Sequence, residues 1–124
     1  MQQIIESILD GIWRSFKTFR RNGEVKLHSL NTYFEYQFEE CKILTITHHN
    51  NNTNKRIAKS TDWEICLDNK RHYLTIKDNH LKYEIVTINH EVLVLMDPTS
   101  SEKTFYARPN TWEHYLTSAK QAIL

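Results

Sequence analysis

Glycine and proline are scarce in this chain, with two of each among 124 residues. Flexible linkers and disordered tails are usually rich in these residues, so the composition leaves little room for either. The remaining composition, 40% apolar and 25% charged, is that of a folded globular protein. The length suits one hydrophobic core, and we expect a single domain spanning residues 1–124.

An excess of charge of one sign is also missing, since 16 basic residues stand against 15 acidic ones. Such a balanced surface has no general attraction for phosphate backbones, and we expect no nucleic-acid partner. No stretch approaches the roughly 18 apolar residues of a membrane span. The first residues have neither the basic segment nor the apolar run of a signal peptide. We therefore expect a cytoplasmic protein, and export would require that a signal peptide had been removed.

Signals for metal binding, covalent cross-linking and catalysis are weak. Cys41 and Cys66 are the two cysteines, and they can be read either as free, partly buried thiols or as a pair in an oxidising compartment. His48 and His49 are adjacent, so on a strand they point to opposite faces and do not easily share one ion. The other histidines are scattered, mostly at turns, and we expect them to be solvated: His28, His72, His80, His90 and His114. We expect no cofactor and no metal site, and no catalytic motif indicates an enzyme.

The first segment of the chain has helical spacing, and the period then changes to two. Apolar residues at positions 4, 5, 8 and 9 predict a short amphipathic helix that Asp10-Gly11 ends. Alternating or apolar runs then predict strands at 13–19, 32–39, 43–47, 63–68, 71–77, 82–87, 92–96 and 103–108. Residues 25–30 can be a strand or a loop, and the polar tract 48–54 is typical of a loop.

A second helix is predicted after Pro109, which ends the last strand. Asn110 can cap this helix, with Glu113 three positions later as in a capping box. Trp112, Tyr115, Leu116, Ala119 and Ile123 lie roughly along one face. The sequence leaves open whether this helix plugs the end of the strand assembly or docks on its side.

About eight strands joined by short turns predict an all-β fold with short terminal helices. Neighbours in sequence are then neighbours in the sheet, which gives an antiparallel up-and-down meander. A meander of eight strands can close into a barrel and thereby remove both edges.

Two features at the ends of this series resemble small bacterial lipocalin-like domains of the calycin group. They are Gly11-Ile12-Trp13 on the first strand and Arg108 on the last. The resemblance implies that Arg108 packs across Trp13 near the closed end, so that Gly11, Trp13 and Arg108 form the barrel closure. The chain differs from larger lipocalins in its short length, in lacking their Thr-Asp-Tyr motif, and in having no disulfide that tethers its C-terminal segment.

Aromatic residues on the inward faces are the candidate ligand site. They are Phe34, Tyr36, Phe38, Trp63, Tyr83 and Tyr106. They could line an apolar cavity in which tyrosine hydroxyls set the orientation of a ligand, or they could fill a small barrel completely. Arg20 and Arg21, with Lys17 and Lys26 nearby, form the densest basic patch, which could meet an anionic partner or be a solvated hairpin tip.

The leading functional hypothesis is non-catalytic binding of a small hydrophobic or amphipathic molecule inside the barrel. One alternative is a protein–protein interaction module, of the immunity or adaptor type, with a packed barrel. Another is a small enzyme acting on a hydrophobic substrate. A fully packed interior would exclude the first hypothesis. The sequence does not identify a ligand, a protein partner or an oligomeric state.

Overall fold

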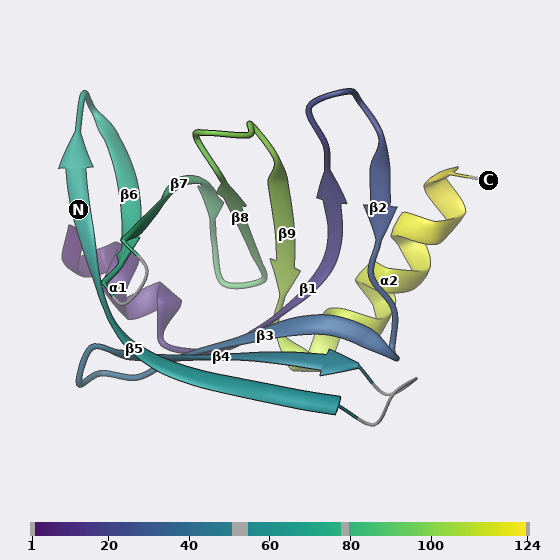
Figure 1. The fold of residues 1–124 in the computed structure, drawn as a ribbon, viewed down its shortest axis with the longest axis horizontal. Coiled ribbons are helices and arrows are strands. Elements are labelled where there is room, and N and C mark those ends of the chain that lie inside the picture. Colours follow the sequence, from purple (N-terminus) through teal and green to yellow (C-terminus); the bar gives the residue numbers. More distant parts are fainter. Residues whose placement is uncertain (1, 51–54, 78–79, 124) are drawn as a thin grey trace.

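A computed structural model of the chain shows an antiparallel sheet that curls into a barrel, with a helix near each terminus (Figure 1). The structure describes residues 2–50, 55–77 and 80–123. The helices are α1 (Gln2–Leu9) and α2 (Pro109–Ile123). The strands are β1 (Gly11–Phe19), β2 (Val25–Leu27), β3 (Thr32–Phe38), β4 (Ile43–Asn50), β5 (Lys55–Asp68), β6 (Arg71–Ile76), β7 (Leu81–Ile88), β8 (Val92–Met96) and β9 (Lys103–Ala107).

Strand β1 closes the barrel because it pairs on both edges. One edge pairs antiparallel with β9, and the other pairs with β3 near its start and with β2 near its end. Strands β1 and β3 to β9 thus form a closed eight-stranded antiparallel barrel, and β2 extends the wall beside β1. The predicted all-β class with an eight-stranded barrel and terminal helices is confirmed, and the architecture is consistent with a lipocalin-like fold.

A β-bulge in β1 sets which of its side chains face inward. The register with β9 shifts between Ser15 and Lys17, so Phe16 and Lys17 both lie on the outer face. Thr18 then returns to the interior, where its hydroxyl meets that of Thr104 on β9. A bulge adds one residue without a partner and re-aims the side chains that follow it. Strict alternation along this strand would have turned Thr18 outward.

Strands β4 and β5 are longer than the sequence predicted. The expectation of a loop over 48–54 was wrong for His48, His49 and Asn50, which continue β4; residues 51–54 lie outside the described residues. The aromatic neighbours on β3 explain the extension, since His48 stacks on Phe34 and His49 stacks on Tyr33, each with ring centroids 4.5 Å apart. Such cross-strand pairs stabilise a sheet even where the residues are polar.

Helix α1 covers one end of the barrel. Ile5 and Leu9 are buried in the same core cluster as Trp13, and the Leu9 carbonyl accepts a hydrogen bond of 2.9 Å from Trp13 Nε1. The helix ends as predicted, and Gly11 follows with φ of 104°, a left-handed conformation that favours glycine. This end of the barrel is therefore closed.

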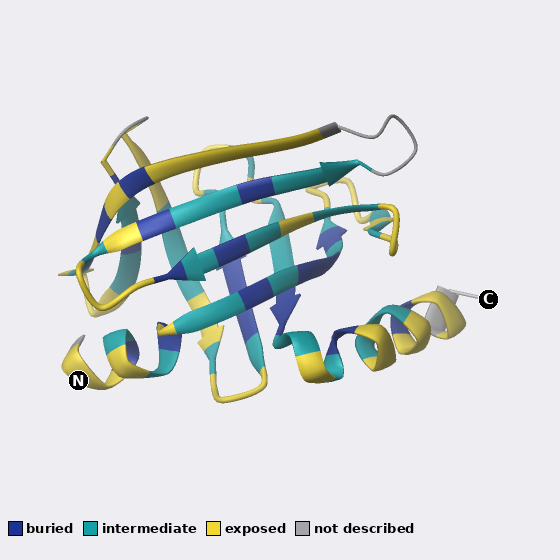
Figure 2. Ribbon diagram, turned by 90° about the horizontal axis from the view of Figure 1, so that it is seen from below, coloured by how far each residue is buried: buried dark blue, intermediate teal, exposed yellow. Residues whose placement is uncertain are grey.

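Helix α2 docks on the side of the barrel, against the outer face of β1. Trp112 is buried beside Phe16 and Ala107, and its Nε1 donates a hydrogen bond of 2.8 Å to the Ser15 carbonyl. Tyr115, Leu116 and Ala119 join this cluster as predicted, while the side chain of Ile123 lies outside the described residues. The two helices lie at opposite ends of the molecule (Figures 1 and 2).

The prediction that Asn110 caps α2 was wrong by two residues. The helix begins at Pro109 rather than after Asn110, and the Arg108 carbonyl accepts a hydrogen bond from the Thr111 N–H. Proline suits the first helical position because its φ is preset and its missing N–H would have had no partner within the helix.

Candidate ligand-binding cavity

The interior of the barrel is packed at one end and hollow at the other. At the packed end Phe38 and Trp63 are 1% and 3% exposed, with ring centroids 5.1 Å apart in an edge-on contact. They belong to the same buried cluster as Leu44 and Ile76, and the apolar face of α1 packs against this cluster. These two predicted site residues therefore lie in the core, away from the cavity. Alternation along a strand indicates which face a residue takes, and it carries no information on depth along the barrel.

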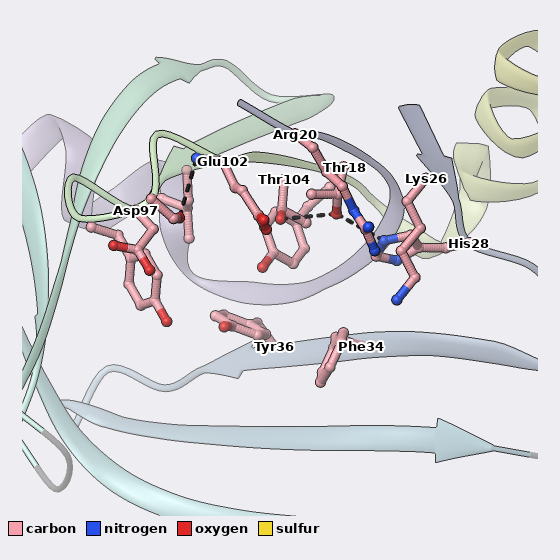
Figure 3. A pocket seen from close by; sticks show the side chains of 13 residues that line it. Thr18, Arg20, Lys26, His28, Phe34, Tyr36, Asp97, Glu102 and Thr104 are labelled. Atoms are coloured by element: carbon pink, nitrogen blue, oxygen red, sulfur yellow. Dashed lines mark hydrogen bonds between the residues drawn. The ribbon is translucent and has the colours of Figure 1, made fainter. Parts of the chain in front are cut away.

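The hollow end holds a cavity of about 330 Å³ that is open to solvent. Four of the predicted ligand-site residues line it, namely Phe34, Tyr36, Tyr83 and Tyr106. Figure 3 shows Phe34 and Tyr36 on β3, facing the residues of β1 and of the β8–β9 segment. The remaining lining residues are Thr18, Arg20, Lys26, His28, Leu95, Asp97, Ser100, Glu102 and Thr104.

Tyrosine side chains form the innermost part of the cavity. The rings of Tyr36 and Tyr106 have centroids 5.0 Å apart, and a hydrogen bond joins their hydroxyls. Burial raises the pKa of Tyr36, Tyr83 and Tyr106 above the ordinary tyrosine value, and all three are neutral phenols at neutral pH. The base of the cavity thus combines aromatic surface with hydroxyl groups.

A chain of hydroxyl groups and one imidazole forms part of the cavity wall. Ser15 Oγ lies 2.5 Å from His28 Nδ1, and Thr18 Oγ1 lies 2.9 Å from His28 Nε2. Thr18 Oγ1 is also 3.1 Å from Thr104 Oγ1. Ser15 Oγ accepts a further hydrogen bond of 2.8 Å from the Phe34 N–H, which links the chain to β3.

The arrangement around Ser15 assigns the tautomer of His28. Within the described part of the chain, Ser15 Oγ contacts one group besides His28, the Phe34 N–H, which is itself a donor. The fully buried Ser15 hydroxyl must therefore donate to His28 Nδ1, since a buried donor without an acceptor is costly. The proton of the neutral imidazole is then on Nε2, which donates to Thr18. Between Thr18 and Thr104, either hydroxyl can be the donor.

His28 is neutral because the protein disfavours its charged form. Burial, reinforced by the charge of Lys26 and by His48, lowers the pKa of His28 from 6.5 to about 4. The expectation that His28 is a solvated turn histidine was therefore wrong. It follows β2, and the pairing of β2 with β1 carries it over the barrel interior.

Charged residues surround the mouth of the cavity. Arg20, which follows β1, and Lys26, on β2, line the cavity. The sequence had left open whether this basic patch meets an anionic partner or is a solvated hairpin tip. Asp97 and Glu102 line it from the β8–β9 segment. Hydrogen bonds from Thr99 lower the pKa of Asp97, so its carboxyl group stays ionised. Pairing between distant strands brings these residues together, and no short motif marks them.

The three residues of the expected barrel closure lie together at the closed end. The Arg108 guanidinium carbon is 3.8 Å from the centroid of the Trp13 ring. A Cβ at Gly11 would stand 3.1 Å from Arg108 Nη1, so any other residue here would require the arginine side chain to shift by a few tenths of an ångström. The group is separated from the cavity by the packed core and does not line it.

Among the described residues, the cysteines and histidines form no metal-binding cluster. Cys41 is exposed, Cys66 is half-buried, and both are free. Across residues 2–50, 55–77 and 80–123, no group of three or more metal-ligating side chains could hold an ion. His48 and His49 do take opposite faces, as predicted, stacking on Phe34 and Tyr33. None of the helices in the described residues is both long enough and apolar enough to cross a membrane.

Comparisons with known proteins do not assign the chain to a family. No protein-family model matches the chain, and no curated protein sequence matches it either. The interpretation of the cavity therefore follows from its geometry.

Proposed function

We propose that this protein binds a small amphipathic molecule, without catalysis, in the cavity at the open end of its barrel. The observation that carries the proposal is the hollow of about 330 Å³ that remains above a fully packed core. A small eight-stranded barrel can be filled by its own side chains, so a cavity of ligand size inside one supports a binding role. Aromatic rings at its base and polar groups at its mouth match a molecule with an apolar and a polar end.

The Ser15–His28 contact supports binding rather than acyl transfer. Ser15 is fully buried and already bonded to the Phe34 N–H, so its hydroxyl does not reach a substrate in the cavity. Both ring nitrogens of His28 are engaged with hydroxyl groups of the wall. A general base needs a nitrogen within reach of the proton that it removes, and neither nitrogen of His28 is free.

The proposal includes a relationship to the small bacterial lipocalin-like domains of the calycin group. The support is the closed eight-stranded barrel together with the packing of Arg108 on Trp13 beside Gly11.

A cavity-filling substitution tests the binding role. Thr104→Tyr places a ring in the cavity, and Thr45→Tyr makes the same change on the outer face, where Thr45 bonds to Ser60. The probe is 8-anilinonaphthalene-1-sulfonate, titrated by fluorescence against each variant. We expect one site in the parent protein and in Thr45→Tyr, and binding at least tenfold weaker in Thr104→Tyr.

Cooperative urea unfolding of each variant shows that it is folded before titration. Equal binding by folded Thr104→Tyr and the parent protein would place the probe elsewhere and contradict the proposal. Equal loss of binding in both variants would also contradict it, because the outer-face change leaves the cavity intact.

A further inference from the structure

Charges of opposite sign face the cavity mouth from two sides. Arg20 and Lys26 come from the β1–β2 hairpin, and Asp97 and Glu102 come from the β8–β9 segment. In Figure 3, Asp97 and Glu102 lie to the left of Arg20 and Lys26, with Tyr36 below and between them. Two cations and two carboxylates therefore line one mouth.

The two sides do not neutralise each other directly. In the described part of the chain, no ion pair joins either cation to either carboxylate. Arg20 approaches Glu24 on its own hairpin, at 3.8 Å and with both side chains largely exposed, which is a weak interaction. The Lys26 and Glu102 side chains have no hydrogen bond or ion pair with any described residue. The charges thus remain available to a molecule between them.

This distribution of charges favours a ligand that carries both a positive and a negative group. Because the four formal charges cancel, a simple anion is attracted by one side and repelled by the other, and the same holds for a simple cation. A molecule with both an ammonium and an anionic group gains from both sides. His28 does not alter this balance, because it is neutral.

The aromatic wall of the cavity selects the rest of the ligand. Phe34 is 39% exposed, and its ring stacks on His48, which fixes its plane. Tyr36 and Leu95 continue the apolar surface inward. Flat apolar groups stack on such rings in offset or edge-on contacts.

We infer that the cavity selects a small zwitterion with a flat apolar portion. Its cationic group faces Asp97 and Glu102, its anionic group faces Arg20 and Lys26, and its apolar portion lies on Phe34. This inference rests on the proposed function and specifies the ligand class for the same cavity.

Four indole compounds that differ in their charged groups test the inference by isothermal titration calorimetry. They are L-tryptophan with both charges, tryptamine with the cation, indole-3-propionate with the anion, and 3-methylindole with neither. We expect tryptophan to bind at least tenfold more tightly than each of the others, since it gains a charged contact that each of them lacks. Equal or tighter binding of any one of the other three would overturn the inference.

Charge-removing variants test which groups select the ligand. Glu102→Gln should weaken tryptophan about tenfold and strengthen indole-3-propionate, because it removes an attraction to the ammonium and a repulsion of the carboxylate. Lys26→Gln should weaken tryptophan similarly and strengthen tryptamine. Glu40→Gln and Lys70→Gln make the same changes at exposed positions outside the cavity and should alter neither affinity. Unchanged tryptophan affinity in both cavity variants would overturn the inference.

The outcome for the ligand class is separate from the outcome for the cavity. Failure of tryptophan to bind at millimolar concentration overturns the zwitterion inference, while the naphthalene sulfonate titration of Thr104→Tyr still decides whether the cavity binds amphipathic molecules. Failure of both experiments removes the binding role itself.

Discussion

The guanidinium group of Arg108 lies over the indole ring of Trp13, with its central carbon 3.8 Å from the ring centroid. The same guanidinium donates hydrogen bonds to four backbone carbonyls, those of Ile8, Asp10, Ile12 and His90. Arg108 follows β9 and Trp13 lies on β1, so the contact joins the first and last strands of the barrel at its closed end. A cation over an indole contributes about 0.5–2 kcal/mol, and the charged hydrogen bonds add to this.

Removing both partners should show that they are coupled. Trp13→Ala deletes a fully buried ring and should lower the free energy of unfolding by about 3–5 kcal/mol. Arg108→Ala should cost about 2 kcal/mol, since it leaves four carbonyls without this donor. Urea unfolding of the double variant should reveal a coupling of about 0.5–2 kcal/mol. Trp13→Phe replaces Trp13→Ala in the cycle if the latter does not fold.

An exposed arginine provides the control for this cycle. Arg71 pairs with Glu84 at 3.0 Å on the surface, and Arg71→Ala should cost about 1 kcal/mol or less, without coupling to Trp13. Strict additivity of the Trp13 and Arg108 substitutions would show that their contact contributes nothing to stability.

Alanine substitutions at the two glycines should distinguish the cost of backbone strain from the cost of a steric contact. Gly11 and Gly23 both have positive φ, at 104° and 88°, so alanine is strained at either position. A Cβ at Gly11 also meets Arg108 Nη1 at 3.1 Å, whereas one at Gly23 meets nothing within 4 Å. We expect Gly23→Ala to cost about 1 kcal/mol and Gly11→Ala about 1 kcal/mol more.

Thermal or urea unfolding in the Arg108→Ala background identifies the source of the difference. Without the guanidinium, the two alanine variants should become equally destabilising. A difference that persisted there would point to the backbone at Gly11 rather than to the contact with Arg108.

His28 should make the protein less stable in mild acid. Burial, Lys26 and His48 lower its pKa from 6.5 to about 4, so between these values the unfolded chain binds a proton that the folded protein does not. The stabilisation is therefore complete above pH 6.5 and is lost progressively as the pH falls toward 4. After a discount for partial exposure to solvent, we expect this loss to be about 2 kcal/mol.

Urea unfolding at pH 7.5 and at pH 4.5 measures this loss. His28→Gln should remove about 2 kcal/mol of the difference between the two conditions, and His90→Gln, at an exposed turn, should keep the difference of the parent protein. An unchanged pH dependence in His28→Gln would show that the imidazole is not held neutral by its surroundings.

The Trp112 hydrogen bond should anchor α2 to the barrel. Trp112→Phe keeps most of the buried ring but removes the donor to the Ser15 carbonyl, which should cost about 1–3 kcal/mol. Tyr115→Phe removes a hydrogen bond on the same helix, to the exposed Glu91 carboxylate, and should cost about 0.5 kcal/mol or less. Chemical denaturation measures the loss in the free energy of unfolding for each variant. Equal losses would mean that the buried Trp112 hydrogen bond stabilises the protein no more than the exposed Tyr115 one.

The arrangement of strands could be predicted because it depends on local patterns. Alternation such as that of Phe34, Tyr36 and Phe38 against polar neighbours reports a half-buried strand, and short turns such as Asn22-Gly23 force sequential pairing. The length of β4 and β5 was missed because His48 and Asn50 look like loop residues unless their partners across the sheet are known. The cap of α2 was misplaced because Asn110 and Pro109 are both good helix-start residues.

The candidate site was predicted only in part, and the reason is physical. Phe34, Tyr36, Tyr83 and Tyr106 line the cavity, but Phe38, on the same face of the same strand, lies in the closed core. Sequence periodicity distinguishes the two faces of a strand, while depth along the barrel depends on which strands and helices cover each level. No local sequence signal distinguishes the aromatic residues that line the cavity from those that lie in the closed core.

By itself, the sequence determined an all-β chain with terminal helices and its meander order, whereas the grouping of Gly11, Trp13 and Arg108 was implied by a family resemblance. Only the tertiary structure decided that His28, Arg20 and Lys26 belong to a cavity. The bulge in β1 turns Thr18 inward, and the pairing of β1 with β2 and β9 carries the charged residues to a common mouth. Local preferences act over a few residues, whereas a cavity arises from what distant strands leave unfilled.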